Sequence, residues 1–451
     1  MSRPARRRGL SAALASVAAT LAVSALSACG VFGAGADLHV LVSFNSAQAA
    51  DQRAWFAHIA EAFKARTGAT VAFDTFASAG DEQTKLQTAM VSGTGPDIYS
   101  LGSTFTPVAY ASGGFHVLSE PDWQRIGGRD RFSPAALATC GPDPQHVIGV
   151  PTSVRPYGMV YNTALFRAAH IDSPPATWDE FVADAKRLTN PATGVYGTAV
   201  DYADPYNPWK YIWTFALQSG GRMISADQHR AELDSPLVSA AVGRYFDLLT
   251  AHHIVDPASV GWKSAQAAAA FASGKAAMLP MVTPQIERTL DKSQVKGSYA
   301  YAPLPLVPFG ATELPLGGIA AGSIGSGDNM VIADYTKHLD LALEFISLVT
   351  STPEQMHYNQ VFGDLPSVTE AENQLVATRP NAAGYAAAQR TAVPTDFTGA
   401  WSSVQIGLTN VTTQSLPALA GGGYDPAEVR ALLARANQTV QTALARAEAP
   451  R

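Results

Sequence analysis

An alternation of strand-like and helix-like segments, beginning at Leu38, limits the folds that this chain can adopt. The run LHVLVSF is short, apolar and rich in β-forming residues, and TVAFDTF further along is a second run of this kind. Between them, bulky side chains recur at Trp55, Ile59 and Phe63, and Gly68 then supplies a helix stop. A strand, a helix and a strand in this order predict a parallel pair with a right-handed crossover, so we expect an α/β fold.

Later segments extend this pattern. The residues from Asp81 to Val91 predict a further helix, and GTGPDIYSLG then turns the chain into a third strand. Thr177 and Glu180 form a T-x-x-E capping box, which predicts a helix with one apolar face. Near the C-terminus, Pro426 after a capping Asp425 predicts the start of a last helix.

The N-terminus has the pattern of a secretory signal peptide. Four arginines and no acid precede an uncharged stretch over residues 10–28. The letters LSAC that end at Cys29 resemble the lipobox of bacterial lipoproteins, in which the cysteine is acylated and the signal is cut just before it. We therefore expect a signal peptide over residues 1–28 and a lipidated Cys29 with a flexible tether over residues 29–37. The alternatives are an ordinary signal peptide and an N-terminal transmembrane helix.

Charge and cysteine content exclude several functions. Loss of the four positive charges of the signal takes the formal net charge from −6 to −10, which disfavours nucleic acids and anionic lipid headgroups as partners. No later segment has 18 uninterrupted apolar residues, so we expect only the lipid anchor to enter the membrane. With Cys29 lipidated, Cys140 has no partner, so we expect neither an intrachain disulfide nor a zinc-thiolate site.

The remaining chain is too long for a single ordinary core. Roughly 420 residues follow the signal, and the composition is 47% hydrophobic and 15% charged. We therefore expect two lobes.

Several stretches, in a fixed order, carry a family resemblance. They are GPDI at residues 95–98, YASGGF, GVPTSVRPYGMVYNTALF, PPATWDEFVADAKRLT, AAAAFASGKAAML, ALEFISLVTSTPEQ and GDLPS. Together with the lipobox they resemble the extracellular solute-binding proteins of ABC importers, the large sugar-binding family that includes maltose-binding protein. The resemblance extends over roughly residues 38–445.

This resemblance implies an α/β, two-lobed periplasmic-binding-protein-like fold of type II. Mixed central sheets flanked by helices would form each lobe, with the ligand cleft between the lobes. The N-terminal lobe would take residues 38–152 plus 300–349, and the C-terminal lobe residues 153–299 plus 350–448. Hinge closure around the ligand would make the closed form recognisable to a membrane permease.

The densest aromatic cluster lies in DYADPYNPWKYIW, residues 201–213. Aromatic faces suit the C–H side of a sugar ring, and short polar side chains suit its hydroxyls. Asp204, Tyr206, Asn207 and Trp209 lie among turn-forming prolines and are predicted to line the cleft, whereas Trp213 is predicted to pack inward. The Asp-Pro-Tyr step also resembles a sugar-contacting Glu-Pro-Tyr step of the family.

Arg155 follows the predicted strand GVPTSV at the first crossing between the lobes, where the family has an acid that contacts sugar. Its guanidinium could bind two hydroxyls, or an acidic ligand, and the alternative is an interlobe salt bridge. Further ligand candidates follow strands or lie in loops. They are Ser43, Asn45, Gln83, Ser103, Thr104, Gly317, Gly318, Asp396 and Trp401. The alternative for the glycine-rich run that contains Gly317 and Gly318 is a mobile loop.

No catalytic motif stands out. The run AGSIG misses the G-x-S-x-G elbow at its first position, and no P-loop or H-E-x-x-H motif occurs. Asp201 and Asp204 could form a glycosidase acid pair, but their spacing fixes no carboxylate distance.

We therefore expect a receptor without catalysis, cofactor or metal, which acts as a monomer with a permease and a separate ATPase at the outer face of the cytoplasmic membrane. A di- or oligosaccharide is the expected ligand. The alternatives are a carbohydrate-active enzyme, an envelope lipoprotein without transport, and a receptor for a sugar phosphate, glycerophosphodiester or amino sugar.

Overall fold

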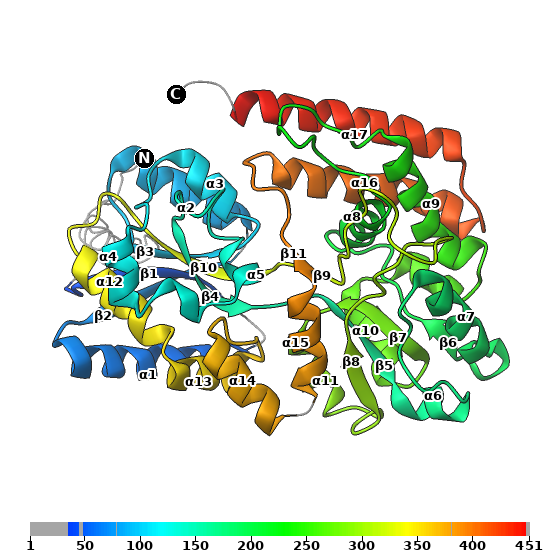
Figure 1. The fold of residues 1–451 in the computed structure, drawn as a ribbon, viewed down its shortest axis with the longest axis horizontal. Helices are drawn as coiled ribbons and strands as arrows, with labels where there is room; N and C mark the ends of the chain where they lie inside the picture. The colour runs from blue at the N-terminus through cyan, green and yellow to red at the C-terminus, as the bar shows by residue number, and fades with distance from the viewer. Residues whose placement is uncertain (1–34, 45–47, 78, 380, 448–451) are drawn as a thin grey trace, which may run out of the picture.

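The computed structural model describes residues 35–44, 48–77, 79–379 and 381–447, which form two lobes side by side (Figure 1). A five-stranded sheet defines the N-terminal lobe and a four-stranded sheet defines the C-terminal lobe. The two short strands β9 (Ser323–Ile324) and β11 (Ala392–Val393) pair in parallel between the lobes.

The sheet of the N-terminal lobe is mixed, with the strand order β2-β1-β3-β10-β4. Strand β1 pairs in parallel with β2 and β3, which confirms the predicted strand–helix–strand unit, and β10 is antiparallel to β3 and β4. The strands are β1 (Leu38–Ser43), β2 (Val71–Phe76), β3 (Ile98–Gly102), β4 (Gly149–Val154) and β10 (Gly327–Ile332).

Helices cover both faces of this sheet because alternate strand residues are apolar on both sides. Val40 and Ile98 pack on the side of α1 and α12, whereas Leu41 and Tyr99 pack on the side of α2 and α3. The helices are α1 (Ala49–Thr67), α2 (Ala79–Ser92), α3 (Thr106–Ser112), α4 (Glu120–Ile126), α5 (Pro134–Leu137), α12 (Leu339–Val349), α13 (Thr352–Phe362) and α14 (Thr369–Thr378).

The C-terminal lobe has the strand order β6-β7-β5-β8 and most of the remaining helices. The predicted capping box is confirmed at the start of α7, where Thr177 and Glu180 satisfy each other's backbone N–H groups. The elements are β5 (Gly158–Asn162), β6 (Tyr196–Thr198), β7 (Ala276–Val282), β8 (Tyr299–Ala302), α6 (Thr163–Ala168), α7 (Trp178–Leu188), α8 (Pro208–Gln218), α9 (Pro236–Thr250), α10 (Ser264–Ala272), α11 (Glu287–Leu290), α15 (Ala382–Arg390), α16 (Trp401–Ala420) and α17 (Pro426–Ala447).

Helix α8 lies in the middle of this lobe, surrounded by α9 and α16 (Figure 1). Every one of its residues from Pro208 to Gln218 is buried. A helix that is buried all round needs apolar residues on all faces, which the run PWKYIWTFAL supplies except at Lys210 and Thr214. Its N-terminal end therefore provides a rigid base for the loop that precedes it.

The segment after residue 350 departs from the predicted lobe boundary. Helix α13 packs against α1, and Phe362 meets the ring of Trp55 edge to face, with 5.9 Å between ring centroids. In contrast, Tyr385 of α15 packs on Tyr301 of β8 with 4.1 Å between centroids. Residues 350–365 thus lie with the N-terminal lobe, although the sequence assigned them to the second lobe, because their apolar face matches α1.

No helix in the described part of the chain combines the length and the apolar character required to cross a bilayer.

Candidate functional site

The chain first crosses between the lobes through Arg155–Tyr157, and a pocket of about 300 Å³ opens beside this crossing. Tyr157 forms one wall, and the loop before α8 contributes Asp201, Tyr206 and Asn207. Most of the remaining wall is apolar and comes from α10 and from the residues along and after β7, with Ser264 and Thr283 as polar members. The apolar residues include Ala267, Ala268, Leu279, Pro280, Met281, Val282 and Ile286.

Asp204 holds the shape of the loop at this pocket. One carboxylate oxygen accepts hydrogen bonds from the backbone N–H groups of Tyr206 and Asn207, both at 2.9 Å. The other oxygen accepts from the backbone N–H of Ser264 at 3.1 Å and from its hydroxyl at 2.8 Å. Burial alone would raise the pKa of Asp204, but these hydrogen bonds outweigh it and lower the pKa. The predicted ligand contact at Asp204 is thus a loop support, with its acceptor sites already occupied.

Lys210 is the charged group of the pocket, and the sequence analysis missed it. Its side chain is buried, with the ammonium nitrogen 4.2 Å from the ring centroid of Tyr157 and 4.6 Å from that of Tyr206. Burial lowers the pKa of Lys210 to about 8, and the nearby Tyr206, Asp201 and Asp204 oppose that fall without cancelling it. A lysine within an otherwise apolar helix, one turn after Asn207, was the signal that could have identified it.

Asn207 connects this lysine to a buried acid. Its side-chain oxygen accepts a hydrogen bond from Lys210, and its side-chain nitrogen donates to the Asp201 carboxylate at 2.5 Å. Burial raises the pKa of Asp201 to about 7, and the hydrogen bond from Asn207 opposes that rise. The three groups form one polar chain along the pocket floor, so Asn207 reaches the pocket as predicted but has both of its polar atoms engaged.

Tyr206 offers the exposed aromatic surface of the pocket, with 45% of the residue accessible. Its hydroxyl accepts a hydrogen bond from Gln405 of α16 at 3.1 Å, and Thr104 of the N-terminal lobe lies near this hydroxyl. This places the predicted residues Tyr206 and Thr104 together across the lobe boundary. Their contact with a ligand stays a prediction.

Trp209 and Trp401 do not face the pocket, contrary to the prediction. Trp209 is 1% exposed and Trp401 is fully buried, and their rings meet edge to face with 5.8 Å between centroids. Both belong to the core of the C-terminal lobe. The sequence analysis treated residues 204–209 as a loop, but α8 begins at Pro208 and turns Trp209 inward.

Arg155 is held by protein carboxylates, which is the salt-bridge alternative that the sequence left open. Its guanidinium makes a two-pronged contact with Asp328 of β10 and donates to Asp364 at 2.8 Å. Gln285 from the C-terminal lobe donates to the second oxygen of Asp364, also at 2.8 Å. Burial would lower the pKa of Arg155, but the two carboxylate charges outweigh it and raise the pKa. The cluster therefore joins the lobes and leaves no uncompensated charge for an acidic ligand.

The predicted residues of the N-terminal lobe differ in where they lie. Ser103 is buried, and its backbone N–H donates to the carbonyl of Gly327. Glu82 of α2, which was not predicted although it adjoins the predicted Gln83, is 6% exposed, and its Oε1 has no hydrogen-bond partner among the described residues. Burial raises the pKa of Glu82 to about 8, and the charge of Asp328 adds to the rise. The side chain of Gln83 and the whole of Asn45 lie outside the described residues.

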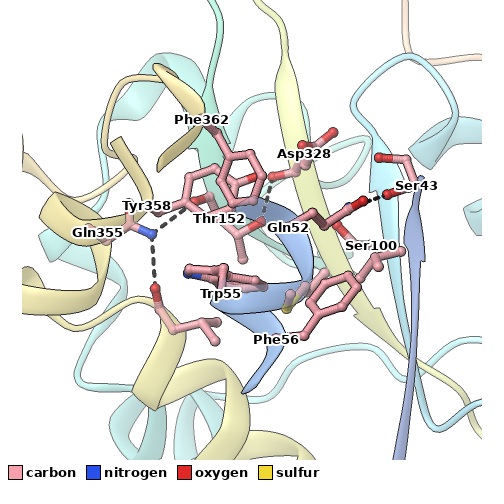
Figure 2. A pocket seen from close by; sticks show the side chains of 13 residues that line it. Ser43, Gln52, Trp55, Phe56, Ser100, Thr152, Asp328, Gln355, Tyr358 and Phe362 are labelled. Atoms are coloured by element: carbon pink, nitrogen blue, oxygen red, sulfur yellow. Dashed lines mark hydrogen bonds between the residues drawn. The ribbon is translucent and has the colours of Figure 1, made fainter. Parts of the chain in front are cut away.

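Ser43 lies at the end of β1 beside a narrow cavity of about 40 Å³ inside the N-terminal lobe (Figure 2). Its carbonyl accepts a hydrogen bond from Gln52 at 2.6 Å, and Trp55 and Tyr358 line the cavity below it. Asp328 lies on the opposite wall. This cavity is too small for a sugar ring, and Ser43 is not among the residues that line the pocket at the lobe crossing.

Asp396, Gly317 and Gly318 lie toward the other end of α8. Gly318 is fixed against that end, because a Cβ added to it would lie 2.4 Å from the carbonyl of Gln218. Asp396 borders a separate pocket of about 90 Å³ with Arg222, and burial raises the pKa of Asp396 to about 6. A helix of 11 residues is about 16 Å long, so these predicted residues do not join the group around Asn207.

A groove of about 430 Å³ between the lobes was not predicted. Tyr110 of α3 and Phe397, which precedes α16, meet edge to face across it with 5.7 Å between centroids. The groove also contains Asp227, Gln228 and His229. The aromatic pair shows that the two lobes approach each other at this end of the interlobe region.

The geometry gives little support to an acid pair for glycoside cleavage. Such a pair needs two carboxyl groups that both face the scissile bond. Asp204 accepts four hydrogen bonds from the protein, and Asp201 is engaged by Asn207.

Comparison with known proteins identifies the class of this fold. The family model of the bacterial extracellular solute-binding proteins matches residues 46–356, so the chain belongs to this family. Diacetylchitobiose binding protein DasA from Streptomyces coelicolor is 27% identical over 370 residues, which cover 78% of each chain. The resemblance stated from the sequence is thus confirmed at the level of the family.

Solved structures with low sequence identity share the fold. The sugar-binding protein MalE from Xanthomonas citri matches with a TM-score of 0.74 and 19% identity over 91% of this chain and 97% of that one. Maltose-bound MalE3 from T. maritima matches with a TM-score of 0.71 and 18% identity over 88% and 98% of the two chains. The predicted two-lobed fold of type II, with mixed sheets flanked by helices, is confirmed.

Proposed function

We propose that this chain is the solute receptor of an ABC importer and binds a di- or oligosaccharide between its lobes. The observation that carries the proposal is the pocket at the lobe crossing, where the exposed ring of Tyr206 lies beside the polar chain of Lys210, Asn207 and Asp201. This pairing of an aromatic face with directed polar groups matches the two sides of a sugar ring.

The proposed site includes residues from both lobes. Tyr157, Tyr206 and Lys210 would contact the ligand from the C-terminal lobe, and Thr104 and Glu82 would approach it from the N-terminal lobe. Closure of the lobes would then bury the ligand and connect the two sets of residues. Asp204 and Asn207 would hold the loop in shape.

Two observations bear on the ligand class. The matched relative DasA is a diacetylchitobiose binding protein, and the matched MalE3 structure contains maltose, which favours a neutral or N-acetylated oligosaccharide. Arg155 is compensated by Asp328 and Asp364, which removes the argument for an acidic ligand that its charge suggested. A sugar phosphate would have to bind at Lys210 instead.

The cellular setting follows from the N-terminal sequence. Cys29 would carry a lipid that holds the receptor at the outer face of the cytoplasmic membrane, and residues 30–37 would serve as a tether; Cys29 lies outside the described residues. The receptor would act as a monomer that delivers its ligand to a separate permease and ATPase. We propose no catalytic step for this chain.

A ligand screen tests the proposal. The purified protein is titrated by calorimetry and thermal shift with diacetylchitobiose, maltose, maltotetraose, ribitol and a glycerophosphodiester. A ligand at a hundred times its dissociation constant should stabilise the protein by about 2.7 kcal/mol, which is visible as a raised midpoint. Binding of one sugar class, with the sugar recovered intact, supports the receptor. Recovery of cleaved sugar contradicts it, and binding of the phosphodiester alone assigns a different ligand class.

A further inference from the structure

Two histidines and a glutamate meet on the outer side of the N-terminal lobe, where α13 packs against α1. His58 belongs to α1, and Glu354 and His357 belong to α13. Nε2 of His58 lies 3.0 Å from both carboxylate oxygens of Glu354, and Nδ1 of His357 lies 3.6 Å from the nearer one. The two imidazole rings stand edge to face with 4.5 Å between centroids.

These distances are close to those that a zinc ion requires of its ligands. In a tetrahedral site with metal–ligand bonds of about 2.1 Å, the ligand atoms are about 3.4 Å apart. The two carboxylate–imidazole distances, 3.0 and 3.6 Å, lie on either side of this value, and the three ligand atoms all fall within 4.8 Å of one another. Only small side-chain rotations are therefore needed to place all three around one ion.

The backbone already holds the three side chains on adjoining faces. Glu354 and His357 are three residues apart on α13, so they project from the same side of the helix. Trp55 of α1 packs on Tyr358 and Phe362, which fixes α1 against α13. The ligands thus come from two elements that core packing holds together, as metal sites need.

The site is accessible from solvent. The His58 side chain is 46% exposed and that of His357 is 35% exposed, whereas Glu354 is only 13% exposed. A water molecule can complete the coordination from the exposed side, as in sites with three protein ligands. Among the described residues, His58, Glu354 and His357 are the group of three potential metal ligands whose ligand atoms all lie within 4.8 Å of one another.

We propose that His58, Glu354 and His357 form a binding site for a divalent transition metal ion, with zinc as the best match. Two imidazoles and one carboxylate are ligands that zinc prefers, and the bound ion links α1 to α13. Helix α13 leads directly to Asp364, and Asn359 of α13 donates to the Asp364 carbonyl at 2.7 Å. The ion therefore fixes the helix that directly precedes Asp364, one of the two carboxylates that hold Arg155. The proposal is independent of the sugar ligand.

Calorimetric titration of the untagged full chain with zinc chloride, after treatment with a chelator, tests the site. The expected result is one ion bound per chain at this site, with affinity reduced about 10–100-fold or more by His58→Ala and by His357→Ala. Glu354→Gln keeps the shape of the side chain and should also weaken binding. The matched control is His146→Ala, since His146 pairs with Asp143 three residues away at 2.8 Å but belongs to no such group of three.

The variants also distinguish a metal site from simple ion pairs between Glu354 and the histidines. Zinc should raise the thermal midpoint of the wild type and of His146→Ala, but not of His58→Ala or His357→Ala. Absence of zinc binding in the wild type, or an unchanged affinity in both His58→Ala and His357→Ala, would overturn the proposal.

Discussion

Two basic side chains lie beside the crossing between the lobes, and their surroundings differ. Arg155 makes ion pairs with Asp328 and Asp364, whereas Lys210 contacts the faces of Tyr157 and Tyr206 and one amide oxygen. The pKa of Arg155 is raised by its carboxylate partners, and the pKa of Lys210 is lowered to about 8 by burial. Removal of one partner from a buried ion pair is strongly destabilising, whereas a buried ammonium group without an ion-pair partner beside a pocket is a candidate for ligand contact.

This contrast makes Lys210, and not Arg155, the better candidate for ligand contact. Arg155 attracted attention because of its place at the lobe crossing, yet the ion pairs make it a structural link. Lys210 lies between the predicted cleft loop and Trp213, which the sequence predicted to pack inward, and its side chain lines the pocket.

Replacement of Arg155 by alanine should have the largest effect on stability. The change removes the cation from Asp364, whose side chain is 1% exposed, and from the partly buried Asp328. The two carboxylates then keep neutral hydrogen-bond donors but no ion-pair partner. We expect a loss of about 3–5 kcal/mol in the free energy of unfolding, measured by urea denaturation. The control is Arg66→Ala, because the exposed pair of Arg66 with Glu344 should contribute about 1 kcal/mol or less. Equal losses in the two variants would contradict the structural role of Arg155.

Trp209→Ala should destabilise the protein by about 3 kcal/mol, although Trp209 was predicted to contact the ligand. The ring is 1% exposed and packs on Trp401 beneath the loop that carries Tyr206. Urea denaturation measures the loss, and calorimetry measures any change in ligand affinity. Unchanged stability with lost affinity would restore Trp209 to the ligand site and contradict its burial.

The fold was largely predictable from the sequence because its signals are local. The parallel pair of β1 and β2 followed from apolar runs on both sides of a helix pattern, and the start of α7 followed from the capping box of Thr177 and Glu180. The path of residues 350–365 was not predictable in this way, since it depends on how Phe362 packs against Trp55, far away in the sequence.

The site was predictable only in part, because composition does not show which way a side chain points. Proline and aromatic residues marked the loop of Tyr206 correctly as part of the pocket wall. They also suggested Trp209 as a ligand contact. That suggestion depended on where α8 begins, because a start at Pro208 turns the ring of Trp209 into the core. Lys210 and Glu82 were missed because their significance lies in burial without a charged partner, which appears only in the folded chain.

Asp201→Asn should change how stability depends on pH. The pKa of Asp201 is 3.8 in the unfolded reference and about 7 in the folded protein, so the folded form holds a proton that the unfolded form has lost between these values. Its contribution is fully present below pH 3.8 and is lost as the pH rises through about 7. Asparagine does not ionise, so the variant does not lose this stability as the pH rises. We therefore expect it to be more stable than the wild type by about 2 kcal/mol at pH 8, with no gain at pH 4.

Urea denaturation across this pH range measures the effect, and Asp204→Asn is the matched control. The pKa of Asp204 is lowered in the folded protein, so its charged form stabilises the fold at neutral pH and Asp204→Asn should be destabilising there. Effects of the same sign in the two variants would contradict the different roles of these carboxylates.

The smallest expected effect concerns the ligand alone. Tyr206→Ala removes the exposed ring of the pocket, and we expect binding to weaken by about 1–2 kcal/mol with little change in stability, because 45% of Tyr206 is accessible. Tyr206→Phe keeps the ring and loses only the contact with Gln405, so it should retain most of the affinity. Calorimetry with the sugar found in the screen measures both variants. If Tyr206→Ala binds as tightly as the wild type while Arg155→Ala does not, the ligand is held on the Arg155 side. Arg155 would then be the basic side chain that contacts the ligand, in place of Lys210.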